Sequence, residues 1–230
     1  AGIADKTYGD ANFGVSASAS SGLAVSFAVG STDTCTISGS TVHITGAGSC
    51  TVTASQAGNG NYNAAPSVPR TFTINKANQA TLTVTAPTSG VYNDKLVPSA
   101  TGGSGTGAVT FTASGTACQM GTGPDAGKLV ITSGTGTCSI TAHQAGDANY
   151  NPIDSAASPV AIGTASQTIT FAGIADKTYG DADFDPGATA SSGLPVSYGA
   201  SGNCSIISGE VHITGAGSCT VTGSEERRGG

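Results

Sequence analysis

Charged and large aromatic residues are scarce in this chain. Tryptophan is absent, and Asp, Glu, Lys and Arg together make up only 10% of the 230 residues. Most of the basic residues stand singly in the sequence, and the net charge is −6. Nucleic acids and anionic membranes select clustered Lys and Arg, so we expect no nucleic-acid partner. No apolar run reaches the roughly 18 residues of a membrane-spanning helix, so we expect no membrane insertion.

Helical periodicity is missing as well. Valine, isoleucine and threonine alternate with other residues in short runs, such as "QTITF" (167–171), "NCSII" (203–207) and "EVHIT" (210–214). Alternation bounded by turn residues, here mostly glycine and serine, is typical of β-strands. The second and third runs flank "SG" and predict a hairpin. The whole chain is predicted to be all-β and built as β-sandwiches.

Internal repetition organises the sequence. The stretch "AGIADKTYGDA" occupies residues 1–11 and recurs at 172–182, and "VHITGAGSCTVT" occurs at 42–53 and again at 211–222. A more divergent copy lies between these two. The spacing gives three copies of ~85 residues, the size of a small β-sandwich domain. The predicted domains are residues 1–76, 77–165 and 166–230, with an atypical charged tail at 224–230.

Each outer copy lacks one strand. The first copy has no counterpart of "QTITF" (167–171), and the third has no counterpart of "RTFTIN" (70–75). A missing edge strand exposes unpaired backbone groups and apolar side chains. We therefore expect this chain to be a fragment of a longer tandem array. The alternative is strand donation between neighbouring molecules, which requires a spare strand.

The cysteines also follow the repeats. They fall two per copy: Cys35 and Cys50, Cys118 and Cys138, Cys204 and Cys219. Strand alternation places Cys35 on the face of Ile37, and Cys50 on the face of Val52, so both sulfurs point inward. We predict one disulfide in each copy, which would stabilise it by about 3 kcal/mol and place the protein in an oxidising compartment. Buried free thiols remain an alternative, as does a zinc site, although no Cys-x-x-Cys spacing supports zinc.

Two longer stretches resemble a known family. The order of strand, hairpin and "GAGSCTVTA" (46–54) is similar to a bacterial immunoglobulin-like repeat, and "QTITFAGIADKTYGDADF" (167–184) is similar to the opening of the glycine-rich MBG-type modules of large bacterial surface proteins. The resemblance covers essentially the whole chain. It implies an all-β array of tandem immunoglobulin-like β-sandwich domains outside the cell, which spaces or displays something else. It supplies no catalytic residues.

Histidines and carboxylates are the candidate ligand residues. Alternation turns His43 and its equivalent His212 toward solvent, and the middle copy has Val130 at that position, so surface residues are favoured over metal ligands. Oxygen ligands cluster in the loop "YGDADFD" (179–185). Calcium prefers such ligands, but Asp also forms turns with its own backbone. The calcium candidates are Asp181, Asp183 and Asp185.

The tyrosines and lysines recur at fixed positions. Tyr8, Tyr92 and Tyr179 are equivalent, and we interpret them as core or corner residues, with glycan stacking as the alternative. We expect Tyr62 and Tyr150 to bond their hydroxyls back to a neighbouring turn. An isopeptide crosslink from the equivalent lysines is disfavoured because they lie in a polar turn: Lys6, Lys95 and Lys177.

Taken together, the residues favour a structural role. No "GxSxG" elbow or other catalytic arrangement occurs, and we expect neither enzyme activity nor a cofactor. We predict a semi-rigid spacer of a secreted or surface-anchored bacterial repeat protein, whose partners are the neighbouring repeats of the same chain. The alternatives are an adhesive or glycan-binding module that touches a surface ligand, and a self-assembling extracellular filament subunit.

Overall fold

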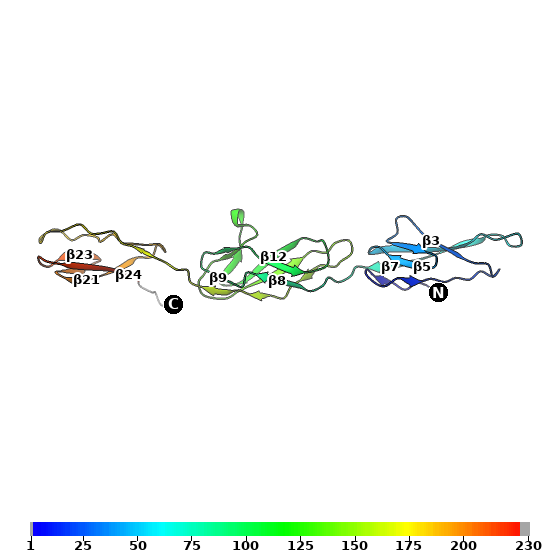
Figure 1. Ribbon diagram of the computed structural model, residues 1–230, viewed down its shortest axis with the longest axis horizontal. Helices are drawn as coiled ribbons and strands as arrows, with labels where there is room; N and C mark the ends of the chain where they lie inside the picture. The colour runs from blue at the N-terminus through cyan, green and yellow to red at the C-terminus, as the bar shows by residue number, and fades with distance from the viewer. Residues whose placement is uncertain (1, 226–230) are drawn as a thin grey trace. The chain divides into compact units, whose positions relative to one another are not determined.

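The structure is a computed structural model that describes residues 2–225 (Figure 1). Over this part of the chain every regular element is a β-strand, apart from one 3-10 turn, η1 (Gly123–Asp125). The predicted all-β class is confirmed. No helix among the described residues is long and apolar enough to cross a membrane. Most of the predicted charged tail at 224–230 lies outside the described residues.

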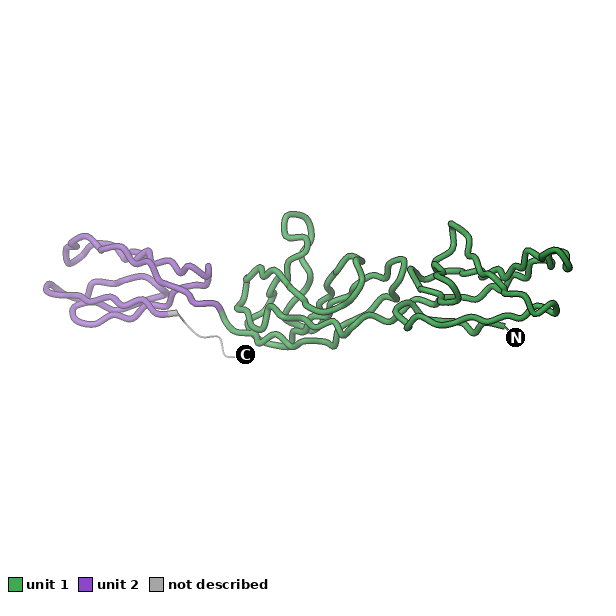
Figure 2. The backbone as a smooth tube through the Cα atoms, turned by 45° about the vertical axis from the view of Figure 1, so that its right-hand side comes forward, with its two compact units in different colours: residues 1–164 green, residues 165–230 purple. Residues whose placement is uncertain are grey.

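The chain divides into two compact units, residues 1–164 and 165–230 (Figure 2). The predicted boundary between residues 165 and 166 lies one residue from this division. The predicted boundary between residues 76 and 77 falls inside the first unit. Strand pairing nevertheless stays within three stretches of sequence, because no named strand before residue 76 pairs with a named strand after it.

The first stretch of unit 1 forms two sheets. Its strands are β1 (Lys6–Thr7), β2 (Phe13–Gly14), β3 (Ser26–Val29), β4 (Cys35–Ser38), β5 (Thr41–Ile44), β6 (Gly48–Gln56) and β7 (Ala65–Asn75). One sheet has the order β1-β7-β6-β3, and the other has the order β2-β5-β4. The edge strand β1 runs parallel to β7, while β6 and β7 are antiparallel. The alternation of buried and exposed residues along β6 and β7 turns one face of this sheet toward the core.

The second stretch of unit 1 forms four sheets of two to four strands. Its strands are β8 (Leu82–Ala86), β9 (Ser89–Val91), β10 (Lys95–Leu96), β11 (Ser99–Gly102), β12 (Val109–Gly115), β13 (Cys118–Met120), β14 (Leu129–Ile131), β15 (Cys138–Gln144), β16 (Ile153–Asp154), β17 (Ser158–Pro159) and β18 (Ala161–Gly163). Strand β15 pairs with β12, β16 and β17, and β18 runs parallel to β9. The η1 turn lies in the longer connection between β13 and β14.

The described part of unit 2, residues 165–225, has three two-stranded sheets. Its strands are β19 (Ile169–Thr170), β20 (Thr189–Ala190), β21 (Val196–Gly202), β22 (Cys204–Ile207), β23 (Glu210–Ile213) and β24 (Cys219–Glu225). The pairs are β19-β20, β21-β24 and β22-β23. The predicted hairpin is confirmed as β22-β23. Its turn residues Ser208 and Gly209 have φ of 51° and 90°, the left-handed conformation that a tight two-residue hairpin requires.

Three disulfides connect strands inside these stretches. They join Cys35 to Cys50, Cys118 to Cys138 and Cys204 to Cys219, with Cα–Cα distances of 5.8, 5.6 and 5.6 Å. The chain has no free cysteine, so neither the thiol nor the zinc alternative agrees with the structure.

Two apolar clusters surround the disulfides of unit 1. One consists of Cys35, Val42, Cys50, Val52, Phe72 and Ile74. The other consists of Cys118, Leu129, Ile131, Cys138, Ile140 and Val160. In both, the inward-facing residues of neighbouring strands pack on the disulfide. Few large side chains contribute, so each of them matters for stability.

Shortening Ile74 tests the contribution of β7 to this packing. Its side chain is 1% exposed, so Ile74→Ala should lower the free energy of unfolding by about 2–5 kcal/mol because it leaves a cavity. Urea denaturation followed by circular dichroism measures this loss. The exposed neighbour Thr73 provides the control, and Thr73→Ala should change stability by only about 0.5 kcal/mol. Equal effects of the two substitutions would contradict the assignment of the inward face.

Candidate functional site

A loop of the second stretch of unit 1 lies against the first stretch. The N–H of Ala47 donates to Asn149 Oδ1 and the N–H of Ala77 donates to the Asn149 carbonyl, both at 2.9 Å. Tyr8 and Tyr150 meet edge to face, with ring centroids 5.5 Å apart. This set of contacts is called the junction below. It joins two stretches of sequence that share no named strand pair.

Asp147 holds the junction loop in shape. Its Oδ1 accepts the N–H groups of Asn149 and Tyr150 at 2.8 and 2.9 Å. Its Oδ2 accepts the N–H and hydroxyl of Thr106 at 2.7 and 3.2 Å. These hydrogen bonds, the Thr106 N–H first, lower the pKa of Asp147 to about 2, because they favour the charged form. Both oxygens are thus engaged by the protein itself.

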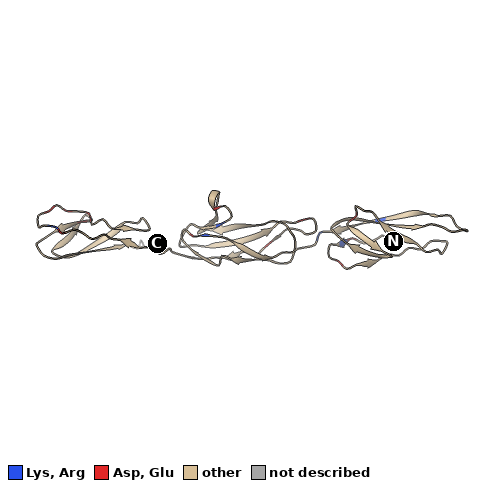
Figure 3. Ribbon diagram, turned by 45° about the horizontal axis from the view of Figure 1, so that its top comes forward, with Lys and Arg blue, Asp and Glu red and all other residues tan. Residues whose placement is uncertain are grey.

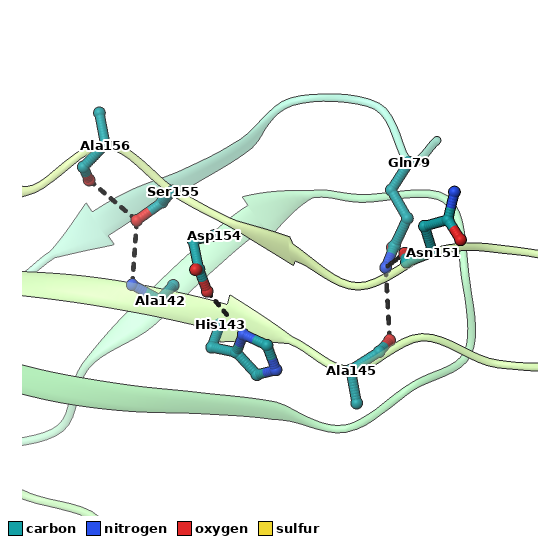
Figure 4. A network of polar contacts seen from close by, with 8 residues as sticks. All are labelled: Gln79, Ala142, His143, Ala145, Asn151, Asp154, Ser155 and Ala156. Carbon is teal, nitrogen blue, oxygen red and sulfur yellow. Dashed lines mark hydrogen bonds and ion pairs between the residues drawn. The ribbon is translucent and has the colours of Figure 1, made fainter. Parts of the chain in front are cut away.

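Gln79 lies in the linker between β7 and β8, and its side chain bonds to the junction loop (Figure 4). Its side chain is only 7% exposed, and its Nε2 donates to the carbonyls of Ala145 and Asn151 at 3.3 and 2.8 Å. Its Oε1 accepts the N–H groups of Ser104 and Gly105 at 3.2 and 3.1 Å. A buried amide with all of these partners is stabilising, whereas the same amide without them would be costly. Sequence reasoning missed Gln79, since an isolated glutamine in a linker carries no pattern.

Two histidines pair with carboxylates. His143 Nδ1 lies 2.5 Å from Asp154 Oδ1, and His212 Nδ1 lies 2.7 Å from Asp183 Oδ1. Figure 4 shows the side chains of the first pair pointing toward each other. All four side chains are at least partly exposed. The surface position expected for His212 agrees with this, but the sequence analysis missed both carboxylate partners. The first copy has no carboxylate at the position of Asp183, because Asn12 stands there.

The three calcium candidates have separate partners. Asp181 Oδ2 accepts the N–H of Thr178 at 2.9 Å, Asp185 Oδ1 accepts the N–H of Gly187 at 2.8 Å, and Asp183 pairs with His212. Across residues 2–225, no group of three or more His, Cys, Asp or Glu side chains could hold a metal ion.

The turn made by Asp181 recurs in the other copies. Asp10 accepts the N–H of Thr7 at 2.8 Å, and Asp94 accepts the N–H of Val91 at 2.9 Å. In each copy the carboxylate therefore closes the same short turn. This shared contact accounts for an aspartate at that position without a ligand.

The equivalent tyrosines have unequal environments. Tyr8 is partly buried against Tyr150, whereas Tyr92 is 51% and Tyr179 66% exposed. The interpretation of all three as core or corner residues is therefore wrong for Tyr92 and Tyr179. Tyr62, for which a bonded hydroxyl was expected, is 54% exposed. The burial of each ring depends on whether a residue from another stretch packs against it, as Tyr150 does against Tyr8.

The equivalent lysines make ordinary side-chain contacts. Lys6 lies over the ring of Phe13 with its Nζ 4.8 Å from the centroid, and Lys177 lies over Phe184 at 4.6 Å. Lys95 pairs with Asp125 at 2.6 Å. Figure 3 shows how sparsely charged residues are distributed along the ribbon.

Two grooves follow the sheets. One, of about 660 Å³, is bordered by residues 14–19 and by strands β3, β6 and β7, and its floor includes Phe27, Val52 and Ala54. The other, of about 920 Å³, lies in unit 2 between residues 171–179 and strand β24, with Phe184, Val211 and Val221 among its lining residues. Each groove lies where another copy of the repeat has a covering strand.

Comparisons with known proteins give little. No family model and no curated protein matches the chain. A solved structure with a detectable likeness is the crystal structure of Drosophila N-cadherin EC1-4, at 11% sequence identity and a TM-score of 0.33. The match covers 98% of this chain and 70% of that one.

The Asp147 carboxyl should titrate far below the usual range. Because its pKa is about 2 in the folded chain and about 3.9 in an unfolded one, the ionised carboxylate stabilises the loop. That contribution is fully present above about pH 4 and is lost as the pH falls toward about 2. NMR of the Asp147 carboxyl carbon and of the Thr106 amide should show a common midpoint near 2. In Asp147→Asn the Thr106 titration should disappear, and a midpoint near 4 would refute the assignment.

Calcium should leave unit 2 unaffected. Since the candidate carboxylates Asp181, Asp183 and Asp185 bond to separate partners, the midpoint of thermal unfolding should be the same in millimolar calcium and in chelator. Differential scanning calorimetry of the oxidised chain measures it. A calcium-dependent rise that disappears when all three aspartates are changed to asparagine would establish the calcium hypothesis instead.

Proposed function

We propose that this chain is a structural spacer segment of a secreted or surface-anchored bacterial repeat protein. In this proposal residues 1–76, 77–165 and 166–230 are three immunoglobulin-like domains, each with one disulfide. The observation that carries the proposal is the junction in unit 1. A spacer must limit the rotation of one domain relative to the next. The junction contacts connect the first two proposed domains and would limit that rotation.

The junction restricts rotation about the linker at 75–79. A free linker of this length would allow its flanking domains many orientations. Here the linker itself is bonded, since the N–H of Asn151 donates to the Ala77 carbonyl at 2.9 Å and Lys76 Nζ donates to the Asp147 carbonyl at 2.5 Å. The Tyr8–Tyr150 ring contact adds apolar area to the same junction. We infer a semi-rigid connection between the first two domains.

The proposed location is outside the cell. Three disulfides and no free thiol are typical of proteins that fold in an oxidising compartment. Small domains with few large apolar residues gain most from such crosslinks. The resemblance of "GAGSCTVTA" to bacterial immunoglobulin-like repeats supports a bacterial surface protein.

An adhesive module is the second candidate. The exposed rings of Tyr62, Tyr92 and Tyr179 favour it, because flat exposed aromatics are the usual platforms for sugars. These rings lie in three separate stretches of the sequence. The spacer proposal is preferred because Tyr8, the equivalent of Tyr92 and Tyr179, contacts Tyr150, the equivalent of Tyr62. The ring positions can thus serve contacts between neighbouring copies.

Removing the junction contacts should loosen unit 1. We expect Asn149→Ala with Tyr150→Ala to broaden the distance distribution between spin labels at the exposed positions Thr36 and Thr83 by at least about twofold, because the linker then regains its torsional freedom. Pulsed electron paramagnetic resonance measures this width. The labels are attached through non-natural amino acids, since all six cysteines form disulfides.

The first copy supplies a matched control. Asn61 and Tyr62 occupy the same loop positions as Asn149 and Tyr150, and Asn59 closes the loop by accepting the N–H groups of Asn61 and Tyr62 at 2.9 and 3.0 Å. This loop is exposed. Asn61→Ala with Tyr62→Ala should therefore leave the distribution unchanged. Equal broadening by both double variants would count against the junction as the source of stiffness.

A further inference from the structure

The exposed loop at residues 57–63 of the first stretch contains a reactive pair of residues. Its sequence is "AGNGNYN", and Asn59 is the one asparagine of the chain that glycine follows. The main-chain nitrogen after an asparagine can attack the side-chain amide, because the chain itself holds the two groups close together. A side chain on the following residue hinders this attack, and glycine has none. Asn59 is therefore a candidate for spontaneous deamidation.

The attacking nitrogen and the leaving group of this reaction are unobstructed. Asn59 and Gly60 are both exposed, and a Cβ placed on Gly60 would meet no atom within 4 Å. Among residues 2–225, neither the Gly60 N–H nor Asn59 Nδ2 makes a hydrogen bond. The Gly60 nitrogen can therefore lose its proton to solvent, and the amide nitrogen can leave as ammonia, without the loss of a hydrogen bond made by either group.

Main-chain donors hold the side-chain oxygen of Asn59. Its Oδ1 accepts the N–H groups of Asn61 and Tyr62 at 2.9 and 3.0 Å. Attack at Cγ gives this oxygen a negative charge in the tetrahedral intermediate. N–H groups aimed at an oxygen that becomes charged stabilise the intermediate, as in the oxyanion hole of an acyl-transfer enzyme. The loop thus supplies both the nucleophile and the groups that stabilise the charge.

We propose that Asn59 is a site of self-modification, at which the folded loop converts the asparagine to an aspartate through a cyclic imide. Gly60 N forms a bond to Asn59 Cγ, the Cγ–Nδ2 bond breaks, and the proton lost from Gly60 N leaves with the ammonia. One water then opens the ring. Cleavage of the new Cγ–N bond restores the main chain and leaves an aspartate. Cleavage at the main-chain carbonyl of Asn59 gives an isoaspartate instead.

The second copy shows that a loop of this shape accommodates a carboxylate. Asp147 is the equivalent of Asn59, and its Oδ1 accepts the N–H groups of Asn149 and Tyr150 at 2.8 and 2.9 Å. These two donors are the equivalents of those that Asn59 accepts. An aspartate formed at position 59 can therefore keep the turn. The modified loop then has the same order of aspartate, a small residue, asparagine and tyrosine as the junction loop.

Ageing of the full oxidised chain at neutral pH tests the proposal. Peptide mapping by mass spectrometry follows every asparagine, because the exchange of an amide for a carboxylic acid raises the mass. We expect Asn59 to react at least about tenfold faster than any other asparagine, since only Asn59 precedes a glycine. The reaction should be faster at about pH 8 than at about pH 6, because the attacking nitrogen must lose its proton.

Two outcomes of the ageing experiment would overturn the proposal. One is an Asn59 that stays intact while other asparagines react. The other is conversion of Asn59 only after the chain has been unfolded in urea, because the folded loop would then protect the amide.

Gly60→Ala provides a matched variant. It introduces the residue that the second copy has at the equivalent position, Ala148, and the space around Gly60 is open. The variant should therefore fold normally, which circular dichroism checks. Conversion of Asn59 should be at least about tenfold slower, because the added methyl group hinders the approach of the nitrogen. Equal rates in the two chains would mean that Gly60 N is not the nucleophile and would contradict the mechanism.

The products differ in charge and in the geometry of the turn. Both lower the net charge from −6 by one unit, so ion exchange separates them from the unmodified chain, and electron-transfer dissociation distinguishes aspartate from isoaspartate. Asn59→Asp makes the aspartate form directly. Its midpoint of thermal unfolding should equal that of the unmodified chain, because the carboxylate accepts the same two N–H groups. A clearly lower midpoint would show that the loop does not accommodate the product and would overturn that part of the proposal.

This modification is independent of the spacer role. The loop around Asn59 is exposed and contributes none of the junction contacts. Conversion of Asn59 should therefore leave the distance distribution within unit 1 unchanged. The ageing experiment and the spin-label experiment can fail separately, so each tests its own proposal.

Discussion

The strand that carries the second cysteine of each disulfide is the element on which the structure depends. Strands β6, β15 and β24 hold this position, and their inward faces consist of a cysteine and a few branched residues. Large apolar side chains are few, so a neighbouring strand that covers such a face adds much of its burial. In unit 1 the cover brings Cys50 to 0% and Ile140 to 0% exposure. The disulfides fix where the faces lie, and the covering strand determines whether they are buried.

Local patterns in the sequence were sufficient to predict the all-β class and the β22-β23 hairpin. Alternation predicted the all-β class, and "SG" between two runs predicted the turn whose residues Ser208 and Gly209 have positive φ. Each of these features depends on interactions between residues close in the sequence. The parallel pairing of β1 with β7 could not be predicted in this way, because the paired residues are almost seventy positions apart. No local pattern in either segment indicates its partner.

The candidate sites were harder to predict for the same reason. Asp181 looked like a calcium ligand because carboxylates stand close together around it, but the N–H it accepts lies three residues back. Asp183, which lies in a loop, instead bonds to His212 of β23. The tyrosines at 8, 92 and 179 share one sequence position, and among residues 2–225 only Tyr8 of these three meets a ring from another stretch. Repetition predicts equivalent backbones, whereas the burial of a surface ring depends on a distant neighbour.

The junction shows how two similar loops of a repeat can differ in what they contact. The loops around Tyr62 and Tyr150 close with the same turn, made by Asn59 in one and Asp147 in the other. Only the second contacts a receiving surface, where Ala47 donates to Asn149 and Tyr8 meets Tyr150. The stiffness proposed for unit 1 therefore requires both the loop and the surface that it contacts. The loop around Tyr62 has the same turn, but it is exposed.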